Sequence, residues 1–163
     1  MTYNNFTIRE IKLEDNPKIA QAIRDILIEF GVPKVGTAYA DKLLDTLFET
    51  YDIEKAAYYI IEKDGNIYGG AGIKQLENYD GKVCELQKMY FLPEARGIGL
   101  GSIMMELCLQ KAKEFGFEQC YLETLPYMKD ARKLYKKSGF KNLSERMGDT
   151  GHYSCNLWML KDL

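Results

Sequence analysis

The sequence predicts a mixed α/β fold of the α+β kind, built on a mostly antiparallel sheet, and two observations carry this prediction. Three β-rich runs follow one another between residues 56 and 93, which excludes a simple parallel doubly wound sheet. Further along, a strand, a helix and another strand alternate, which favours one βαβ unit. The chain has 163 residues, 46% of them hydrophobic. We therefore expect residues 1–163 to form one domain.

The first third of the chain predicts one strand and two helices. Residues 6–13 alternate apolar and polar side chains, as a half-buried strand does. Residues 16–31 have apolar residues at helical spacing, with Pro17 in the first turn and Gly31 at the end. Residues 38–52 predict a second amphipathic helix.

The rest of the chain predicts a hairpin, a βαβ unit and a closing pair of strands. Asp64 and Gly65 are typical of a tight turn, which would join the first two of the three successive β-rich runs. The elements expected after that hairpin are a strand over 82–93, a helix over 102–116, a strand over 119–125, a helix over 127–139, and strands over 139–147 and 152–163. We expect about seven strands flanked by four helices.

Composition excludes several functional classes. The formal net charge of −2 gives no basic face for nucleic acid. No apolar run approaches the roughly 20 residues of a membrane span, and the start of the chain is polar and acidic, unlike a secretory leader. We expect a cytoplasmic protein that binds neither nucleic acid nor membrane. The four cysteines are far apart and the chain has one histidine, so no metal site is expected.

Three glycines at alternate positions, Gly97, Gly99 and Gly101, stand between a predicted strand and a predicted helix. The free amides of a helix start and the positive end of the helix dipole make such a turn a phosphate site. A Walker loop needs GK[ST], but Ser102 follows the last glycine. A dinucleotide fingerprint needs GxGxxG, which fails from either starting glycine. The third pattern, [Q/R]-x-x-G-x-[G/A], fits Arg96 to Gly101.

This third pattern resembles the coenzyme A loop of the GNAT superfamily of N-acetyltransferases. The resemblance continues in ELQKMYFLPEARGIGLG, which is similar to the family's fourth strand and pyrophosphate loop, and in DARKLYKKSGF, which is similar to its A-x-x-L-Y-x-x-x-G-F helix. The order of elements also agrees along nearly the whole chain. The resemblance implies an acetyltransferase that uses acetyl-CoA as cosubstrate, with no metal.

The resemblance also implies which residues hold the coenzyme. The loop amides would bind the pyrophosphate, and the backbone of the fourth strand would pair with the pantetheine arm. An N–H near Met89 would donate to the thioester oxygen. The family often has an asparagine where this chain has Met128, so contact there would be apolar. The expected cofactor-binding residues are Met89, Tyr90, Phe91, Arg96, Gly97, Ile98, Gly99, Leu100, Gly101, Ser102 and Met128.

Tyr135 is the candidate general acid, because its place in the pattern matches the family tyrosine that lies near the coenzyme sulfur. A phenol is protonated at neutral pH and can protonate a leaving thiolate. The alternative is that Tyr135 packs on the buried helix face beside Ala131 and Leu134.

The base is left open between Glu85 on the fourth strand and Glu123 on the next one. By alternation Glu85 shares a face with Gln87 and Met89, unless a bulge re-aims the later residues. His152 is a third candidate, expected to lie in a solvated loop. An acyl-enzyme on Cys84 is not favoured, since that thiol faces away from Glu85.

The acceptor is expected to be a small-molecule or peptide amine that meets the first two helices and residues 144–152; a homodimer stays open. Two other functions remain alternatives: a non-catalytic acyl-CoA-binding sensor module and a nucleotide-binding oxidoreductase. Tyr135 and a carboxylate in the cleft argue against the sensor module, and the missing third glycine of the fingerprint and the three successive strands argue against the oxidoreductase.

Overall fold

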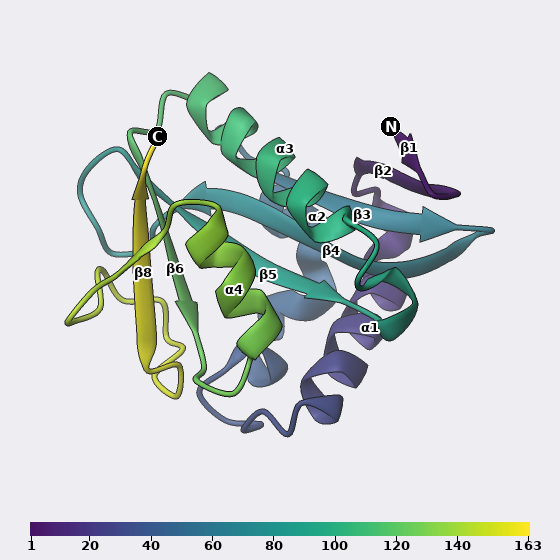
Figure 1. Ribbon diagram of the computed structural model, residues 1–163, viewed down its shortest axis with the longest axis horizontal. Coiled ribbons are helices and arrows are strands. Elements are labelled where there is room, and N and C mark those ends of the chain that lie inside the picture. The colour runs from purple at the N-terminus through teal and green to yellow at the C-terminus, as the bar shows by residue number, and fades with distance from the viewer.

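A computed structural model describes residues 1–163, and its centre is one eight-stranded sheet with the order β1-β2-β3-β4-β5-β6-β8-β7 (Figure 1). The strands are β1 Thr2–Tyr3, β2 Phe6–Glu10, β3 Ala57–Lys63, β4 Asn66–Gln75, β5 Val83–Phe91, β6 Gln119–Thr124, β7 Lys141–Asn142 and β8 Leu157–Asp162. Only β5 and β6 pair in parallel. The mixed, mostly antiparallel fold is therefore confirmed.

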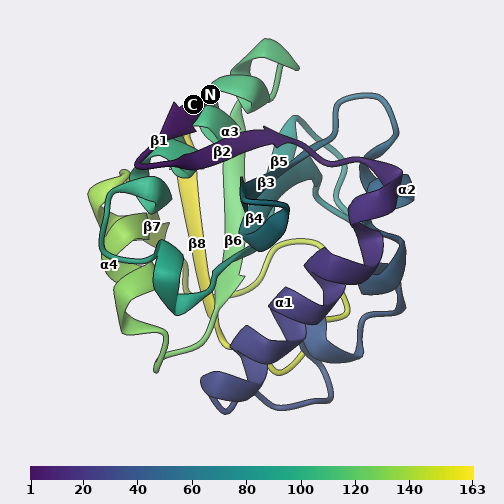
Figure 2. The same ribbon diagram turned by 90° about the vertical axis from the view of Figure 1, so that its right-hand side faces the viewer.

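Four α-helices flank the sheet: α1 Asn16–Glu29, α2 Leu47–Tyr51, α3 Leu100–Glu114 and α4 Lys129–Lys137. Short 3-10 turns, Leu13–Asp15, Ala38–Ala40, Lys42–Thr46 and Pro93–Ala95, complete the helical segments. Figure 2 shows α1 on one side of the sheet and α4 on the other. None of the helices is both long and apolar enough to cross a bilayer.

The alternation of side chains along β3 explains this two-sided cover. Tyr58 and Ile60 pack with α1 and α2, whereas Tyr59 and Ile61 pack with α3. A strand that is apolar on both faces needs helices on both faces. The sheet thus separates two cores.

The sheet has eight strands where about seven were expected, and the additional strand is the two-residue β1. Asn4 and Asn5 have φ of 48° and 67°, and they turn the chain so that β1 pairs with β2. Asparagine tolerates this left-handed backbone better than most residues, so the Asn-Asn pair was a readable turn signal. The predicted Asp64-Gly65 hairpin turn is confirmed between β3 and β4.

The predicted helix over 38–52 is wrong in its first two thirds. The chain forms two 3-10 turns there and becomes helical only from Leu47. Asp41 has extended backbone angles, and its side chain accepts a hydrogen bond from the Leu43 amide at 2.9 Å. An aspartate that caps a backbone amide in this way competes with a continuous helix.

The predicted strand over 139–147 is reduced to Lys141–Asn142. The Leu143 amide still donates to the Trp158 carbonyl of β8 at 2.8 Å, and further along the Asp149 amide donates to the Glu77 carbonyl in the loop after β4 at 3.1 Å. Hydrogen bonds to this loop replace the strand ladder that the alternation predicted.

Candidate active site

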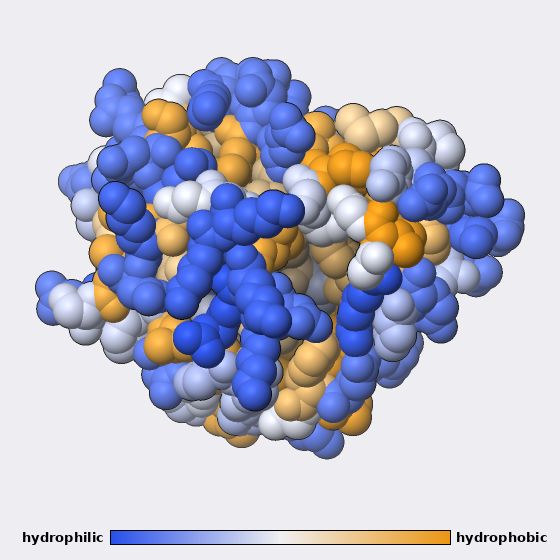
Figure 3. Space-filling model, viewed as in Figure 1, coloured by the Kyte–Doolittle hydropathy of each residue, from blue (hydrophilic) through white to orange (hydrophobic).

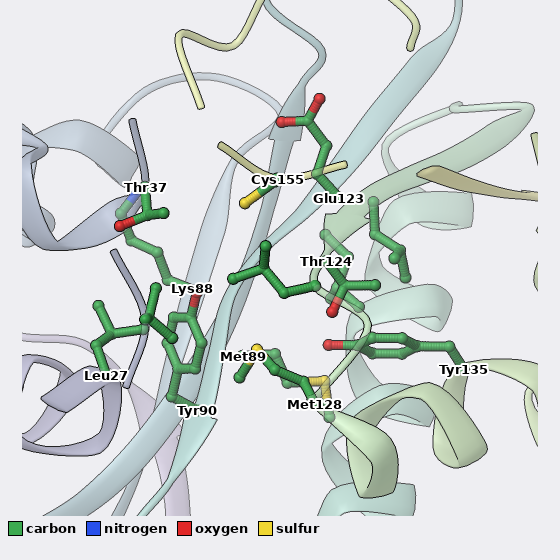
Figure 4. Close-up of a pocket in the computed structure, with 14 residues that line it drawn as sticks. Leu27, Thr37, Lys88, Met89, Tyr90, Glu123, Thr124, Met128, Tyr135 and Cys155 are labelled. Atoms are coloured by element: carbon green, nitrogen blue, oxygen red, sulfur yellow. The ribbon is translucent and has the colours of Figure 1, made fainter. Parts of the chain in front are cut away.

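The strands β5 and β6 diverge, and a crevice opens between them. They pair only over Val83–Glu85 with Gln119–Tyr121, although both strands continue beyond those residues. Past this point the main-chain groups of β5 that face β6 have no strand partner. The crevice is lined by Leu27, Val32, Thr37, Leu86, Lys88, Met89, Tyr90, Leu122, Glu123, Thr124, Leu125, Met128, Tyr135 and Cys155 (Figure 4).

A bulge in β5 lies at the mouth of this split. The register with β4 skips so that Lys88 and Met89 both stand opposite Ala71, and Lys88 has a left-handed φ of 49°. The bulge turns Met89 toward the α3 core, so Met89 does not share a face with Glu85 as simple alternation predicted. Gln87 does share that face, since its side-chain amide Nε2 donates to the Glu85 carboxylate at 2.5 Å.

Tyr58 on β3 braces the bulge from two strands away. Its ring crosses β4 over Gly70 and Gly72, and its hydroxyl donates to the Lys88 carbonyl at 2.8 Å. A methyl group at Gly72 would lie 2.5 Å from the Tyr58 ring. The glycines of β4 therefore leave the room that this contact needs.

We expect Tyr58→Phe to lower the free energy of unfolding by about 1 kcal/mol, the usual cost of leaving a buried carbonyl without its donor. Urea denaturation measures this loss. Tyr59→Phe is the matched control, because Tyr59 is the next residue on the strand and points to the other core. Equal stability of Tyr58→Phe and wild type would contradict a bracing role.

The three glycines of the loop meet different requirements. Gly97 and Gly99 have φ of 72° and 91°, which other residues adopt only with strain. Gly99 is the N-cap of α3 and offers no side chain to the first free amides of the helix. Gly101 lies inside α3, and a Cβ there would approach Leu134 at 3.2 Å and Phe91 at 3.4 Å.

A cavity of about 420 Å³ extends from this loop along β5 to α4. Figure 3 shows apolar surface in a hollow beside the hydrophilic ridge of α4. The cavity is lined by Ile26, Phe30, Met89, Tyr90, Phe91, Ala95, Arg96, Gly97, Gly101, Met128, Asp130, Ala131, Leu134 and Tyr135. Met89, Tyr90, Met128 and Tyr135 also line the crevice, so the two hollows meet at these residues.

Tyr135 stands where the cavity and the crevice meet. Burial, with a smaller contribution from Cys155, raises its pKa, so the phenol is protonated at neutral pH. Its ring packs against Phe140 with the centroids 6.2 Å apart. Figure 4 shows its hydroxyl directed into the crevice toward Met89 and Met128.

Two carboxylates belong to the strands that flank the crevice, Glu85 on β5 and Glu123 on β6, and Glu85 does not line the crevice itself. Glu123 lines it, and both of its oxygens accept hydrogen bonds, one from the Tyr121 hydroxyl at 2.7 Å and one from Thr150. Glu85 is 3% exposed. Burial raises the pKa of Glu85 to about 7; the Gln87 hydrogen bond lowers it and the Glu123 charge raises it. Glu85 thus changes charge near neutral pH, which suits a group that exchanges protons.

These features agree with one known family. The model of the acetyltransferase (GNAT) family matches residues 20–140. The chain belongs to the GNAT family of acetyltransferases. Its match with the uncharacterized N-acetyltransferase YjgM of Escherichia coli is 41% identical over 157 residues and covers 96% of this chain and 94% of that protein.

Solved GNAT structures share the fold. An acetyltransferase of the family from Staphylococcus aureus has a TM-score of 0.82 at 20% identity, over 97% of this chain and 99% of that one. The yncA protein of Salmonella typhimurium, solved with its cofactor acetyl-CoA, has a TM-score of 0.77 at 17% identity, over 98% of this chain and 95% of that one.

In this GNAT chain the Arg96 side chain is bound within the protein. Its guanidinium pairs with Glu29 at 2.7 and 3.0 Å, donates to the Phe91 carbonyl at 2.7 Å and lies over the Phe30 ring. Arg96 therefore fixes the loop against α1 and lines the cavity with its remaining surface. Of the other predicted loop residues, Ile98 is half-buried, Leu100 is buried and Ser102 is exposed.

Sequence reasoning missed a buried network beside the GNAT crevice. Lys88, with a side chain 4% exposed, lies 3.2 Å from Asp41, and the same Asp41 oxygen lies 3.5 Å from His152 Nε2. His152 is thus partly buried against Asp41, where a solvated position was predicted. Burial raises the pKa of Asp41, but its contacts with His152, Lys88 and the Leu43 amide outweigh burial and hold the pKa well below its usual range. No local pattern marks three residues so far apart in sequence.

Proposed function

We propose that this GNAT enzyme transfers an acetyl group from acetyl-CoA to a primary amine by direct attack in a ternary complex. Acetyl-CoA supplies an acetyl thioester. Membership of the acetyltransferase family rests on the family match. The amine acceptor and the direct attack rest mainly on a single observation. The split between β5 and β6 joins the glycine-loop cavity to a crevice lined by the Tyr135 phenol and the Glu123 carboxylate, with Glu85 buried nearby on β5.

The residues present fit the coenzyme. The amides from Gly97 to Ser102 would hold the pyrophosphate, since the N-cap glycine leaves them without a side-chain partner. The unpaired edge of β5 over Met89, Tyr90 and Phe91 would pair with the pantetheine arm as an added strand does. Met128 would contribute apolar contact at the junction of the two hollows.

Glu85 would act as the general base and Tyr135 as the general acid. Glu85, through a water, removes the proton that makes the acceptor an ammonium, while Glu123 holds the cation in the crevice. The nitrogen–carbon bond forms as the carbon–sulfur bond breaks, and Tyr135 protonates the leaving sulfur. Tyr135 recovers its proton from the new amide nitrogen. In total the ammonium loses two protons, one to the thiol and one through Glu85 to solvent.

Glu85 is favoured over Glu123 as the base for a physical reason. Both oxygens of Glu123 already accept hydrogen bonds from Tyr121 and Thr150. A base with a pKa near the working pH combines availability with proton affinity, and Glu85 has that value.

We expect Gly101→Val to weaken acetyl-CoA binding at least about tenfold, because the added methyl groups would enter the space between Leu134 and Phe91. Isothermal titration calorimetry measures the Kd. Gly101 is a cleaner site for this test than Gly99, since its backbone is not left-handed. Gln110→Val, at an exposed position of α3, controls for the helix cost of valine.

Thiol release from acetyl-CoA in the presence of an amine panel separates this proposal from a non-catalytic acyl-CoA sensor. Tight binding of acetyl-CoA with no amine-dependent thiol release would contradict it, and so would unchanged binding in Gly101→Val.

A further inference from the structure

A third hollow lies next to the crevice. Its volume is about 270 Å³, and it is lined by Val35, Gly36, Thr37, Ala40, Asp41, Leu43, Glu77, Thr150, Gly151, His152 and Tyr153. It meets the crevice at Thr37, which lines both. Thr150 on its wall is hydrogen-bonded to Glu123 of the crevice. This volume is just below the usual range for ligand sites, roughly 300–1,000 Å³, so only a small ligand fits.

No lysine or arginine lines this acceptor hollow. The nearest buried cation, Lys88, is already paired with Asp41. The guanidinium of Arg146 donates to the carbonyls of Tyr153 and Cys155 and lies over Trp158. His152 also lines the hollow but lies against Asp41, so a substrate carboxylate placed here would find no free cation and would face Asp41 and Glu77. Burying an unpaired anion is costly, so the hollow disfavours amino acids.

The rim of the hollow is apolar and exposed. Val35 is 64% exposed, Leu43 43% and Tyr153 62%, and all three line this one hollow. Large apolar side chains gathered around a concavity mark a place where an apolar group binds. A second ammonium far from the reacting one would find both carboxylates of the hollow already paired, Asp41 with Lys88 and Glu77 with Lys74, which disfavours polyamines.

We propose that the acceptor is a small primary amine with an uncharged, apolar body and no carboxylate. Its ammonium faces Glu123 in the crevice, and its body lies between Val35, Leu43 and Tyr153. This inference rests on the proposed function and narrows the class of its acceptor.

Three probes of equal chain length test the proposal: hexylamine, aminocaproate with a carboxylate at the far end, and hexamethylenediamine with a second ammonium there. The assay is amine-dependent thiol release from acetyl-CoA. We expect kcat/KM for hexylamine to exceed that of each charged probe at least about tenfold, in line with the cost of an unpaired charge in an apolar site. Equal or faster turnover of either charged probe, or no turnover of hexylamine, overturns the proposal.

A rim variant makes the test specific for this hollow. Tyr153→Ser should lower kcat/KM for hexylamine about fivefold or more and leave the Kd of acetyl-CoA unchanged. Ile53→Ser is the control, since Ile53 is 57% exposed and lies outside the hollow. Equal kcat/KM values in the two variants would overturn the assignment of the rim. A chain that fails to bind acetyl-CoA at all would instead overturn the proposed function.

Discussion

Glu85→Gln should lower kcat about a hundredfold or more while leaving the Kd of acetyl-CoA within about twofold of wild type. Loss of a general base usually costs a factor of that size. Glutamine keeps the shape of the side chain next to Gln87 but cannot take a proton. Steady-state kinetics with the best amine of a panel give kcat, and calorimetry gives the Kd.

The pH profile makes this prediction specific for a base. In wild type kcat/KM should rise with pH through about 7, because the carboxylate is the active form and the pKa of Glu85 is raised to about 7. Glu123→Gln should move this ascending limb to lower pH, since the charge of Glu123 raises the pKa of Glu85. If kcat/KM of Glu85→Gln still rises with pH through about 7 as in wild type, another group is the base.

Tyr135→Phe should lower kcat about thirtyfold or more, with little change in acetyl-CoA affinity. Phenylalanine keeps the ring that packs against Phe140 but has no proton for the leaving sulfur. Tyr59→Phe is a matched control, because Tyr59 is also a buried phenol with a raised pKa, on a strand away from the crevice. Equal losses in kcat and in affinity would point instead to a packing role for Tyr135.

The sequence predicted the parts of this structure that local patterns determine. The alternation and helical spacing gave the order of the elements, because burial on a strand or a helix follows a fixed period. The glycine loop was also readable, since left-handed turns before a helix need glycine. The helix over 38–52 failed because Asp41 forms a local cap and also pairs with Lys88 and His152, which lie far away in the sequence.

The site was predictable only in part for the same reason. Tyr135 could be named from its place in a motif, whereas Glu85 was named only as one of two candidate bases beside Glu123. The raised pKa of Glu85 depends on burial and on Glu123, which belongs to another strand. The bulge at Lys88 depends on the Tyr58 hydroxyl and on the glycines of β4, so no stretch of β5 alone predicts where Met89 points.

The most direct test of this account is a crystal structure of the protein with acetyl-CoA. We predict that the diphosphate binds the amides between Gly97 and Ser102, that the pantetheine arm runs along Met89 to Phe91 between β5 and β6, and that the sulfur lies within hydrogen-bonding reach of the Tyr135 hydroxyl. A coenzyme bound elsewhere on the protein, or a sulfur far from Tyr135, would contradict the account.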